Sequence, residues 1–426
     1  MANNTDMELG KVDIVDQAVK FLLECEVKGQ NRDHQPCIFK VPSVLKDMSP
    51  DSYNPRVISI GPLHREAIKV QAMEERKATY LHNLLGRLKL PREETLKTCV
   101  MKITSLDKIQ ESYGERMSYT DVELAQTMVM DGFFILEFLH NYDEYTSDVL
   151  LAMDISHDLI LLENQIPFFV LQDLFECTIL KYDPNASLIE LILKFLDCIR
   201  LFVKKLKVEQ TNPDHILGLL HKCYQPEKPI QSEIQGKKVH SAAELDRACV
   251  KFKPSQDPNW AMAIKVETSR SRWFPLLWAK PTLKMPVMNV NDFTESIMRN
   301  LIVYEQSSNH VPNYITSYAI FIDTLVDTKE DIVKLVDSGV IINDLGSSEE
   351  VVNIFNHISK DICVAEFFYN QQWAEIEEHY NGYWPRNLAR LRRTYFNSPW
   401  NIVALIAGIV LFALTIVQTI FTIKAA

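Results

Sequence analysis

Glycine is scarce in this chain, which has only 12 glycines in 426 residues. That number argues against β-propellers, glycine-rich phosphate-binding loops and long flexible linkers, because all three depend on glycine. The sequence also lacks the motifs GxGxxG, GxxxxGK(S/T), GxSxG and HExxH. We therefore expect a protein that is not an enzyme of these classes and that holds no cofactor.

Basic residues are fewer than acidic ones: the chain has 45 Lys and Arg against 56 Asp and Glu, which gives a formal net charge of −11. Binding to nucleic acid requires clustered Lys and Arg to neutralise phosphates. The acidic balance therefore predicts no nucleic-acid partner.

The eight cysteines include no CxxC pair, and their spacing fits neither a zinc site nor a compact disulfide framework. Reduced thiols in a cytosolic domain are the interpretation that remains. His215, His221 and Cys223 are close in sequence, but a metal site needs three or four converging ligands. We interpret these three residues as structural and predict no metal site.

The C-terminus carries one long apolar run, 22 uncharged residues from Ile402 to Ile423. As a helix this run is roughly 33 Å long, enough to cross the hydrocarbon core of a bilayer. Four arginines precede it within residues 386–393 and only Lys424 follows it, so the positive-inside rule places the N-terminal portion in the cytosol. We predict a C-terminal anchor at residues 399–424, in the plasma membrane or an endomembrane, with membrane lipid as its partner.

The predicted anchor has recognisable features along its length. Trp400 stands where an indole favours the membrane interface, and the span runs from Ile402 through Gln418 to Ile423. Ala404 and Gly408 form a small-xxx-small pair, a spacing that allows two membrane helices to approach closely. The pair predicts a homodimer.

Apolar periodicity predicts a mainly α fold: a large helical domain with a small antiparallel β element and one C-terminal transmembrane helix. The expected organisation is an N-terminal helical lead-in at 1–32, one cytosolic domain at 33–395 with a polar loop near 225–238, and the anchor. The helices of the lead-in and of the first part of the domain are expected at 13–26, 67–88, 92–117, 120–141, 158–163, 167–180 and 185–207, with a brief turn at 148–152. The later helices are expected at 241–249, 292–306, 317–325, 328–338 and 349–359, then as a long helix to 380 and a basic helix before the anchor.

Short strands are expected at Val57–Ile60, Ile264–Thr268 and Thr282–Val290, where β-branched residues or apolar alternation occur. The first of these lies within a stretch that carries five prolines between Pro36 and Pro62, a density that prevents a long helix. We therefore expect this stretch to be extended.

Two carboxylates interrupt very apolar stretches, Asp131 in TMVMDGFFILEF and Glu163 in LILLENQIPFFVL. A carboxylate in such surroundings is costly unless it is paired. One hypothesis is that each is neutralised by a cation of the preceding helices and fixes helix register, the candidate cations being Arg76, Lys77 and Arg116. The alternative is that the two carboxylates form a buried pair for general acid–base catalysis, as in a membrane-bound hydrolase.

Asn164 and Gln165 stand directly before Ile166-Pro167. Pro167 disfavours helix at Ile166 and leaves upstream carbonyl groups without their helical donors. We expect the two side-chain amides to donate to those carbonyl groups. A role in recognition is the alternative.

Several segments in series resemble one protein family, the plant family of domain of unknown function 247. The resemblance covers roughly residues 33–426 and is carried by CIFKVPSVLKDMSPDSYNPRVISIGPLHRE, AMEERKATYL, MVMDGFFILEFL, DLILLENQIPFFVL, SAAELDRACVKFK, NLIVYEQ, DIVKLVDSGVIIN and the Pro399-Trp400 segment before the apolar tail. The family is membrane-associated and has no established enzymatic activity. Some grass members are implicated in pollen self-incompatibility, a role that is not carried over to this chain.

The resemblance places family motif positions on eleven residues of particular interest, which are Gly61, Pro62, Glu74, Lys77, Asp131, Gly132, Glu163, Asn164, Gln165, Pro167 and Glu305. The chain departs from the pattern at Arg247-Ala248-Cys249-Val250, where Ala-Gly-Val is commoner. We expect this change to alter a tight backbone approach beside Val250 without endangering the fold.

The sequence thus predicts a non-catalytic recognition or signalling protein tethered to a membrane, with protein partners. The polar loops near Tyr142–Asp148 and Gln225–Lys238 are the expected sources of specificity. The membrane-bound hydrolase is the second hypothesis.

Overall fold

The computed structural model describes residues 36–425 except for short gaps at 104, 116–118, 146–147, 209–211, 232–239, 270–279, 364–365, 383–386 and 388–398. The predicted lead-in at 1–32, with its helix at 13–26, lies outside the described residues. The predicted basic helix before the anchor lies almost entirely outside them as well. Within the described part the fold is mainly α, as predicted, with small β-sheets and one long C-terminal helix.

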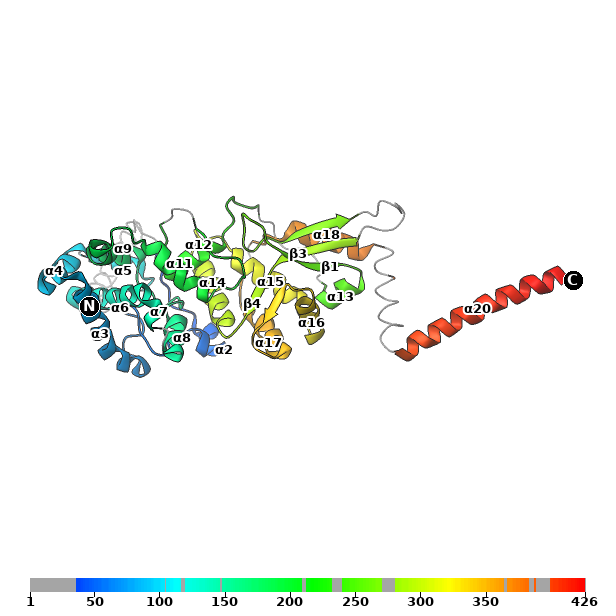
Figure 1. Ribbon diagram of the computed structural model, residues 1–426, viewed down its shortest axis with the longest axis horizontal. Coiled ribbons are helices and arrows are strands. Elements are labelled where there is room, and N and C mark those ends of the chain that lie inside the picture. Colours follow the sequence, from blue (N-terminus) through cyan, green and yellow to red (C-terminus); the bar gives the residue numbers. More distant parts are fainter. Residues whose placement is uncertain are drawn as a thin grey trace, which may run out of the picture.

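Helices from the first half of the chain occupy one end of an elongated body (Figure 1). They are α2 (Ser43–Met48), η1 (Pro50–Ser52), η2 (Ile68–Val70), α3 (Gln71–Leu88), α4 (Arg92–Lys102), α5 (Leu106–Ser112), α6 (Asp121–His140), α7 (Tyr142–Tyr145), α8 (Val149–Asp158), α9 (Phe168–Cys177), α10 (Ile179–Tyr182), α11 (Leu188–Cys198) and α12 (Ile216–Tyr224).

The second half adds helices and all the named strands, and the strands lie toward the other end of the body (Figure 1). The helices are α13 (Ala242–Arg247), α14 (Thr294–Ser307), α15 (Tyr314–Leu325), α16 (Lys329–Asp337), α17 (Ser348–Ile358), α18 (Asn370–Asn381) and α20 (Pro399–Ala425). The strands are β1 (Lys251–Ser255), β2 (Lys265–Ser269), β3 (Lys280–Pro286), β4 (Met288–Val290) and β5 (Ile341–Asn343).

The strands form two small sheets. In the first, β2 pairs antiparallel with β3, and β1 adds to the other edge of β3 in parallel. In the second, β4 pairs in parallel with β5. The antiparallel element of the prediction is therefore the β2–β3 pair, and β1 makes its sheet mixed.

Helix α6 is the central helix of the first half. Thr120 forms a capping box with Glu123 at its start, and the helix is buried on nearly all sides from Leu124 to Leu139. Such a helix belongs in a core rather than on a surface. At Gly132 an added Cβ atom would lie 2.2 Å from Leu174 Cδ1 on α9, so glycine permits the close packing of α6 on α9.

Three predicted elements of the first half are wrong in extent. The predicted helix 92–117 ends at Lys102 and resumes as α5, since the Ile103 amide turns back to the carbonyls of Cys99 and Val100. The predicted helix 185–207 ends at Cys198, after which the Leu201 amide binds Tyr224 Oη at 2.9 Å. The predicted helix 158–163 is instead an irregular stretch, because α8 ends at Asp158.

Helix boundaries in the second half agree better. The Ser241 side chain accepts a hydrogen bond from the Glu244 amide, as the SAAE sequence predicts. The predicted strand 282–290 divides into β3 and β4, which bind different partner strands on either side of Val287. The predicted long helix to 380 begins only at Asn370.

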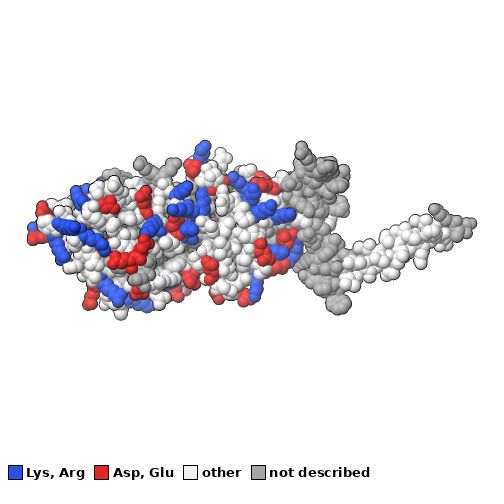
Figure 2. Space-filling view, in the orientation of Figure 1, with Lys and Arg blue, Asp and Glu red and all other residues white. Residues whose placement is uncertain are grey.

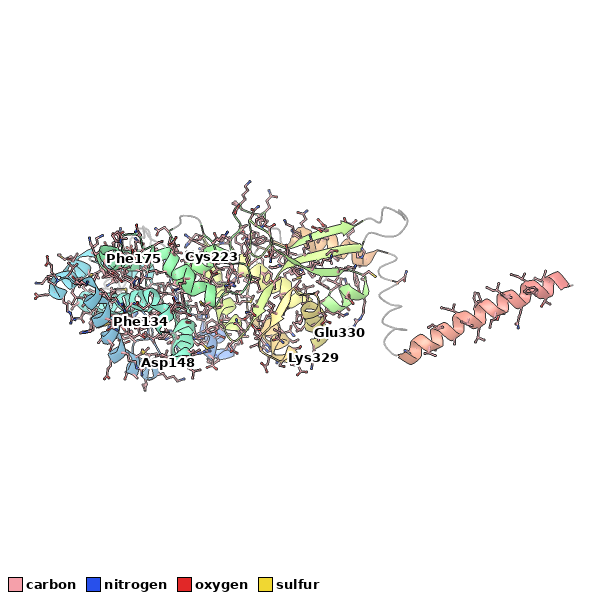
Figure 3. All side chains as sticks on the ribbon, viewed as in Figure 1. Phe134, Asp148, Phe175, Cys223, Lys329 and Glu330 are labelled. Atoms are coloured by element: carbon pink, nitrogen blue, oxygen red, sulfur yellow. The ribbon has the colours of Figure 1, made fainter. Side chains whose placement is uncertain are left out.

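Helix α20 extends away from the body (Figure 1). Its side chains project outward with no other element of the body beside them (Figure 3), whereas Phe134 and Phe175 lie within the body. The window Ile406–Ile423 has a mean hydropathy of 2.3, and none of it is buried. The predicted anchor is thus one helix that is long and apolar enough to cross a membrane.

Candidate functional site

Most of the motif positions gather around residues 36–65, which we call the N-terminal segment. The prediction that this stretch is extended is wrong in part, because α2 and η1 lie within it. This segment binds α6 at Asp131 and the end of α8 at Asp158, and it forms no named strand. Its backbone groups are bound instead by side chains of the helices and of the turn at 159–166, as the following contacts show.

Asp131 on α6 and Lys77 on α3 form a buried ion pair, with Asp131 Oδ1 2.6 Å from Lys77 Nζ. The second carboxylate oxygen of Asp131 accepts a hydrogen bond of 2.7 Å from the Gly61 amide. Lys77 Nζ also donates to the Ser59 carbonyl and to Glu74 Oε1, each at 2.5 Å. The prediction that a cation neutralises Asp131 is confirmed for Lys77, and Arg116 lies outside the described residues.

Burial raises the pKa of Asp131 above that of an exposed aspartate, and the charge and hydrogen bond of Lys77, with the Gly61 amide, oppose that rise. The adjoining cavity has a volume of only about 10 Å³, the space of about one water molecule, between Arg65, Thr127 and the ion pair. This space is too small for an organic substrate.

Gly61 has a backbone φ of +72°, a conformation that favours glycine. An added Cβ atom would lie 2.6 Å from the Gln165 carbonyl oxygen and 2.9 Å from Tyr113 Oη. Both conformation and space therefore require glycine before Pro62, which explains the Gly-Pro motif.

Glu163 binds a second part of the N-terminal segment. Its carboxylate accepts hydrogen bonds from the Val41 amide at 2.5 Å and from Lys46 Nζ at 2.7 Å, and His64 Nε2 lies 2.9 Å away. Burial alone would raise the pKa of Glu163, but the bonds from His64, Lys46 and Val41 outweigh burial and lower the pKa below its ordinary value. Neither Lys46 nor His64 was a predicted partner, because both precede Glu163 by about a hundred residues.

Asp131 and Glu163 are thus held by separate donors, and no hydrogen bond between them occurs in the described part of the chain. Acid–base catalysis by a carboxylate pair requires the two groups to share a substrate-accessible space. The contacts instead give each carboxylate its own lysine and its own backbone amide.

The predicted strand at Val57–Ile60 is wrong, and its contacts supply the reason. Asp158 accepts hydrogen bonds from the amides of Arg56, Val57 and Ile58 at 2.8 to 2.9 Å. Asn164 then accepts from the Ile60 amide at 2.7 Å and donates to the Ile58 carbonyl at 3.1 Å. Side chains therefore occupy the backbone groups that a neighbouring strand would have bound.

The predicted role of the amides before Pro167 is confirmed. Asn164 Nδ2 donates to the Asp158 carbonyl at 3.0 Å. Gln165 Nε2 donates to the carbonyls of Leu159 and Leu161 at 2.8 and 2.9 Å. The two side chains therefore donate to upstream carbonyls as expected, although those of Asp158 and Leu161 also accept from the backbone amides of Leu161 and Asn164.

Glu305 performs the same kind of task in the second half. Its carboxylate accepts hydrogen bonds from the amides of Ile315 and Thr316 at 2.8 and 2.7 Å, and so caps the start of α15. It also accepts from Thr316 Oγ1 at 2.6 Å and lies 2.7 Å from His221 Nε2.

The histidines of the candidate metal trio have structural partners. His215 Nδ1 accepts from the Gly218 amide at 3.0 Å, and Nε2 lies 3.0 Å from the Cys37 carbonyl, which suits a neutral ring. Burial lowers the pKa of His215 to about 4. Among the described residues, no group of His, Cys, Asp and Glu is arranged to hold a metal ion.

The departure from the family pattern falls on a constrained position. Cys249 has a φ of +67°, in the left-handed region that favours glycine. Its amide binds the Asp246 carbonyl and the Val250 amide binds the Leu245 carbonyl, which closes the end of α13 before β1. The departure from the family pattern therefore strains the backbone at Cys249, beside Val250, while the hydrogen bonds of the turn remain intact.

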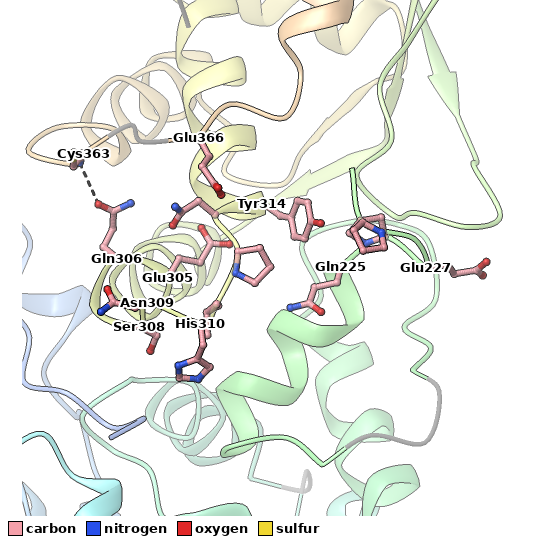
Figure 4. Close-up of a pocket in the computed structure, with 15 residues that line it drawn as sticks. Gln225, Glu227, Glu305, Gln306, Ser308, Asn309, His310, Tyr314, Cys363 and Glu366 are labelled. Atoms are coloured by element: carbon pink, nitrogen blue, oxygen red, sulfur yellow. Dashed lines mark hydrogen bonds between the residues drawn. The ribbon is translucent and has the colours of Figure 1, made fainter. Parts of the chain in front are cut away.

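An open pocket of about 840 Å³ lies where the end of α14 meets the polar loop that follows α12 (Figure 4). Glu305 and Gln306 of the Tyr-Glu-Gln motif contribute to its wall, together with Gln225, Pro226, Glu227 and Pro229. Gln306 Oε1 accepts a hydrogen bond from the Cys363 amide at 3.2 Å. Two buried oxygens of the lining residues, Ser308 Oγ and Asn313 Oδ1, have no partner among the residues that the structure describes.

A helical body with a network of buried carboxylates and amides, followed by one exposed apolar helix, defines a protein with a rigid core and a membrane-length tail. A sequence model described as a plant protein of unknown function, domain of unknown function 247, matches residues 38–414. The chain belongs to this plant family.

Two proteins from Arabidopsis thaliana are similar to this chain over most of its length. The protein named UPF0481 protein At3g47200 is 29% identical over 416 residues, which cover 90% of this chain and 85% of the relative. The protein named Putative UPF0481 protein At3g02645 is 22% identical over 487 residues, which cover 89% of each chain. No solved structure matches the chain.

Proposed function

We propose that this chain is a non-catalytic recognition protein that α20 holds at the cytosolic face of a membrane, and that the pocket of Figure 4 binds a segment of a partner protein. The observation that carries the proposal is the exposure of α20, whose apolar side chains are covered by no other part of the chain that the structure describes. Burying such a helix in lipid removes that surface from water. The arginines that precede it favour a cytosolic body.

A role in binding rather than catalysis is supported by what the motif carboxylates do. Asp131, Glu163 and Glu305 all accept hydrogen bonds from backbone amides, and each is at most 2% exposed. These groups stabilise the fold. Glu305 also lines the pocket of Figure 4, but both of its carboxylate oxygens are already bound by Ile315, Thr316 and His221. The membrane-bound hydrolase therefore gains no support from their geometry.

The pocket suits a polar peptide segment. Its walls combine amide and hydroxyl side chains with three prolines, and Glu366 points toward its middle in Figure 4. A carboxylate at that place favours a lysine or arginine of the partner. The predicted polar loop contributes Gln225, Pro226, Glu227 and Pro229 to the same wall, so variation in this loop alters specificity.

Two exposed cysteines allow a matched test of this site. Cys363 lines the pocket, whereas Cys198 is exposed at the end of α11, away from the pocket residues. Burial raises the pKa of the Cys37, Cys99, Cys177 and Cys223 thiols and makes them unreactive toward maleimides.

A benzophenone maleimide is attached to Cys363 in a Cys25→Ser, Cys198→Ser, Cys249→Ser chain, or to Cys198 in the reciprocal chain with Cys363→Ser. Both chains are then irradiated in plant microsomes. The proposal predicts a discrete crosslinked protein from Cys363 that Cys198 does not give. Equal crosslinking from both positions, or none from Cys363, contradicts it.

Self-association through α20 is part of the same proposal. No atom of the described residues lies within 4 Å of the place where a Cβ atom would be added at Gly408, so this face of the helix has room for a second copy. The test is the mass of the detergent-solubilised protein, compared between the unmodified chain and a Gly408→Ile chain. The proposal predicts that self-association is lost in the Gly408→Ile chain. An unchanged mass contradicts it.

A further inference from the structure

A second pocket, with a volume of about 570 Å³, shares Gln225, Pro226 and Glu227 with the pocket of Figure 4. Four lysines line it, at positions 204, 205, 207 and 222. Lysine and arginine side chains are visible on this part of the body, near α11 and α12, in Figure 2. In a chain with a net charge of −11, such a concentration of positive charge needs an explanation.

Two of these lysines bind backbone carbonyl groups, and Lys222 Nζ donates to the Asn212 carbonyl at 2.6 Å. Lys204 Nζ donates to two backbone carbonyls, those of Asp257 and Pro258, each at 2.7 Å. Lys205 and Lys207 are exposed. Within the described ranges, no carboxylate forms an ion pair with Lys204, Lys205 or Lys207.

The carboxylates around the pocket do not cancel this charge. Glu227 is the one that lines it among the described residues, and the side chain of Asp257 is bound by Lys265 at 2.5 Å. Burial lowers the pKa of Lys204, and the charges of Asp257 and Glu227 oppose only part of this shift. Burial also lowers the pKa of Lys222. The partly buried ammonium group of Lys204 has no ion-paired carboxylate in the part of the chain that the structure describes, and a bound anion offsets the cost of burying it.

We propose that this pocket binds a small ligand with several phosphate groups, either a soluble polyphosphate or the phosphorylated headgroup of a lipid. Lysines act as point charges and do not impose the planar geometry of arginine, so a cluster of them suits a compact ligand of high charge density. The volume fits a ligand of that size. Leu206, Pro226 and Ala261 supply an apolar wall for its carbon framework.

The test uses the full chain in detergent micelles with two probes, inositol hexakisphosphate and dioctanoyl phosphatidylinositol 4,5-bisphosphate. Binding is measured by titration calorimetry at 150 mM salt and repeated at higher salt. The test variant is Lys205→Glu with Lys207→Glu, two exposed side chains whose replacement leaves the core intact. The matched control is Lys251→Glu with Lys253→Glu, which makes the same charge change at the same spacing on exposed positions of β1 outside the pocket.

The proposal predicts that at least one probe binds the unmodified chain, that the test variant loses roughly tenfold or more in affinity, and that the control does not. Tighter binding of the inositol phosphate identifies a soluble source, and tighter binding of the lipid identifies a headgroup. Failure of both probes to bind overturns the proposal, as does an equal loss in the test and control variants. The result is independent of whether a protein partner crosslinks at Cys363.

Discussion

Lys77 Nζ lies 2.6 Å from Asp131 Oδ1, and each of these two side chains is only 2% exposed. The pair joins α3 to α6, and its remaining hydrogen bonds reach the backbone of the N-terminal segment at Ser59 and Gly61. One ion pair therefore fixes three parts of the chain relative to one another.

We predict that Asp131→Asn destabilises the protein by about 3 kcal/mol, because it leaves the Lys77 ammonium group buried with only Glu74 as an anionic partner. The measurement is urea unfolding of the full chain in detergent. Adding Lys77→Met to this variant removes the uncompensated charge and restores part of the loss. Additive losses in the double variant would contradict the ion-pair account.

Asn164→Ala is expected to release the N-terminal segment locally as well as to lower global stability by about 3 kcal/mol, since one side chain makes three buried hydrogen bonds. Hydrogen exchange followed by mass spectrometry measures this at the amides of residues 57–61. Asn54→Ala is the control, because Asn54 lies on the same segment but is exposed. Exchange at 57–61 that is equal in the two variants refutes the assignment.

The lowered pKa of Glu163 makes a prediction for acid pH. A carboxyl group whose folded-state pKa is below its unfolded value of 4.5 stabilises the protein above pH 4.5 and loses this contribution as the pH falls through the folded pKa. Glu163→Gln should therefore be less stable than the unmodified chain at pH 7, and the two unfolding free energies should converge below about pH 4.5. A difference that stays constant from pH 7 to pH 3 contradicts the prediction.

Cys249→Gly should raise stability by about 1 kcal/mol, since the positive φ at this position strains any residue that has a Cβ atom. Cys249→Ala keeps the Cβ atom and should give no such gain. Thermal unfolding of the two variants in parallel separates relief of backbone strain from loss of the thiol. A gain in Ala equal to that in Gly shows that strain is not the cause.

Helical periodicity and the apolar tail were sufficient to predict the fold class, because local patterns determine α6, α14 and α20. The requirement that buried Asp131 have a cation also correctly indicated Lys77. Contacts across long sequence distances could not be read in the same way. Glu163 is bound by Lys46 and His64, about a hundred residues earlier, and no periodicity connects them.

The error at Val57–Ile60 has the same origin. Its β-branched composition is typical of a strand. However, the side chains of Asp158 and Asn164 bind its backbone amides, which are then not available for pairing with another strand. The pockets could not be predicted from the sequence either, since residues from α12, α14, α15 and several connecting segments meet only in the folded chain. Only the polar composition of residues 225–238 pointed to that region.

Membrane attachment by α20 is tested most directly in plant cells that express the full chain or a chain that lacks residues 399–426, each with an N-terminal tag. The account predicts that the full chain remains in the membrane pellet after alkaline carbonate extraction and that protease added to intact microsomes removes its tag. It also predicts that the shortened chain is found in the soluble fraction. A shortened chain that stays in the carbonate-resistant pellet, or a tag on the full chain that is protected from protease, would contradict the central claim.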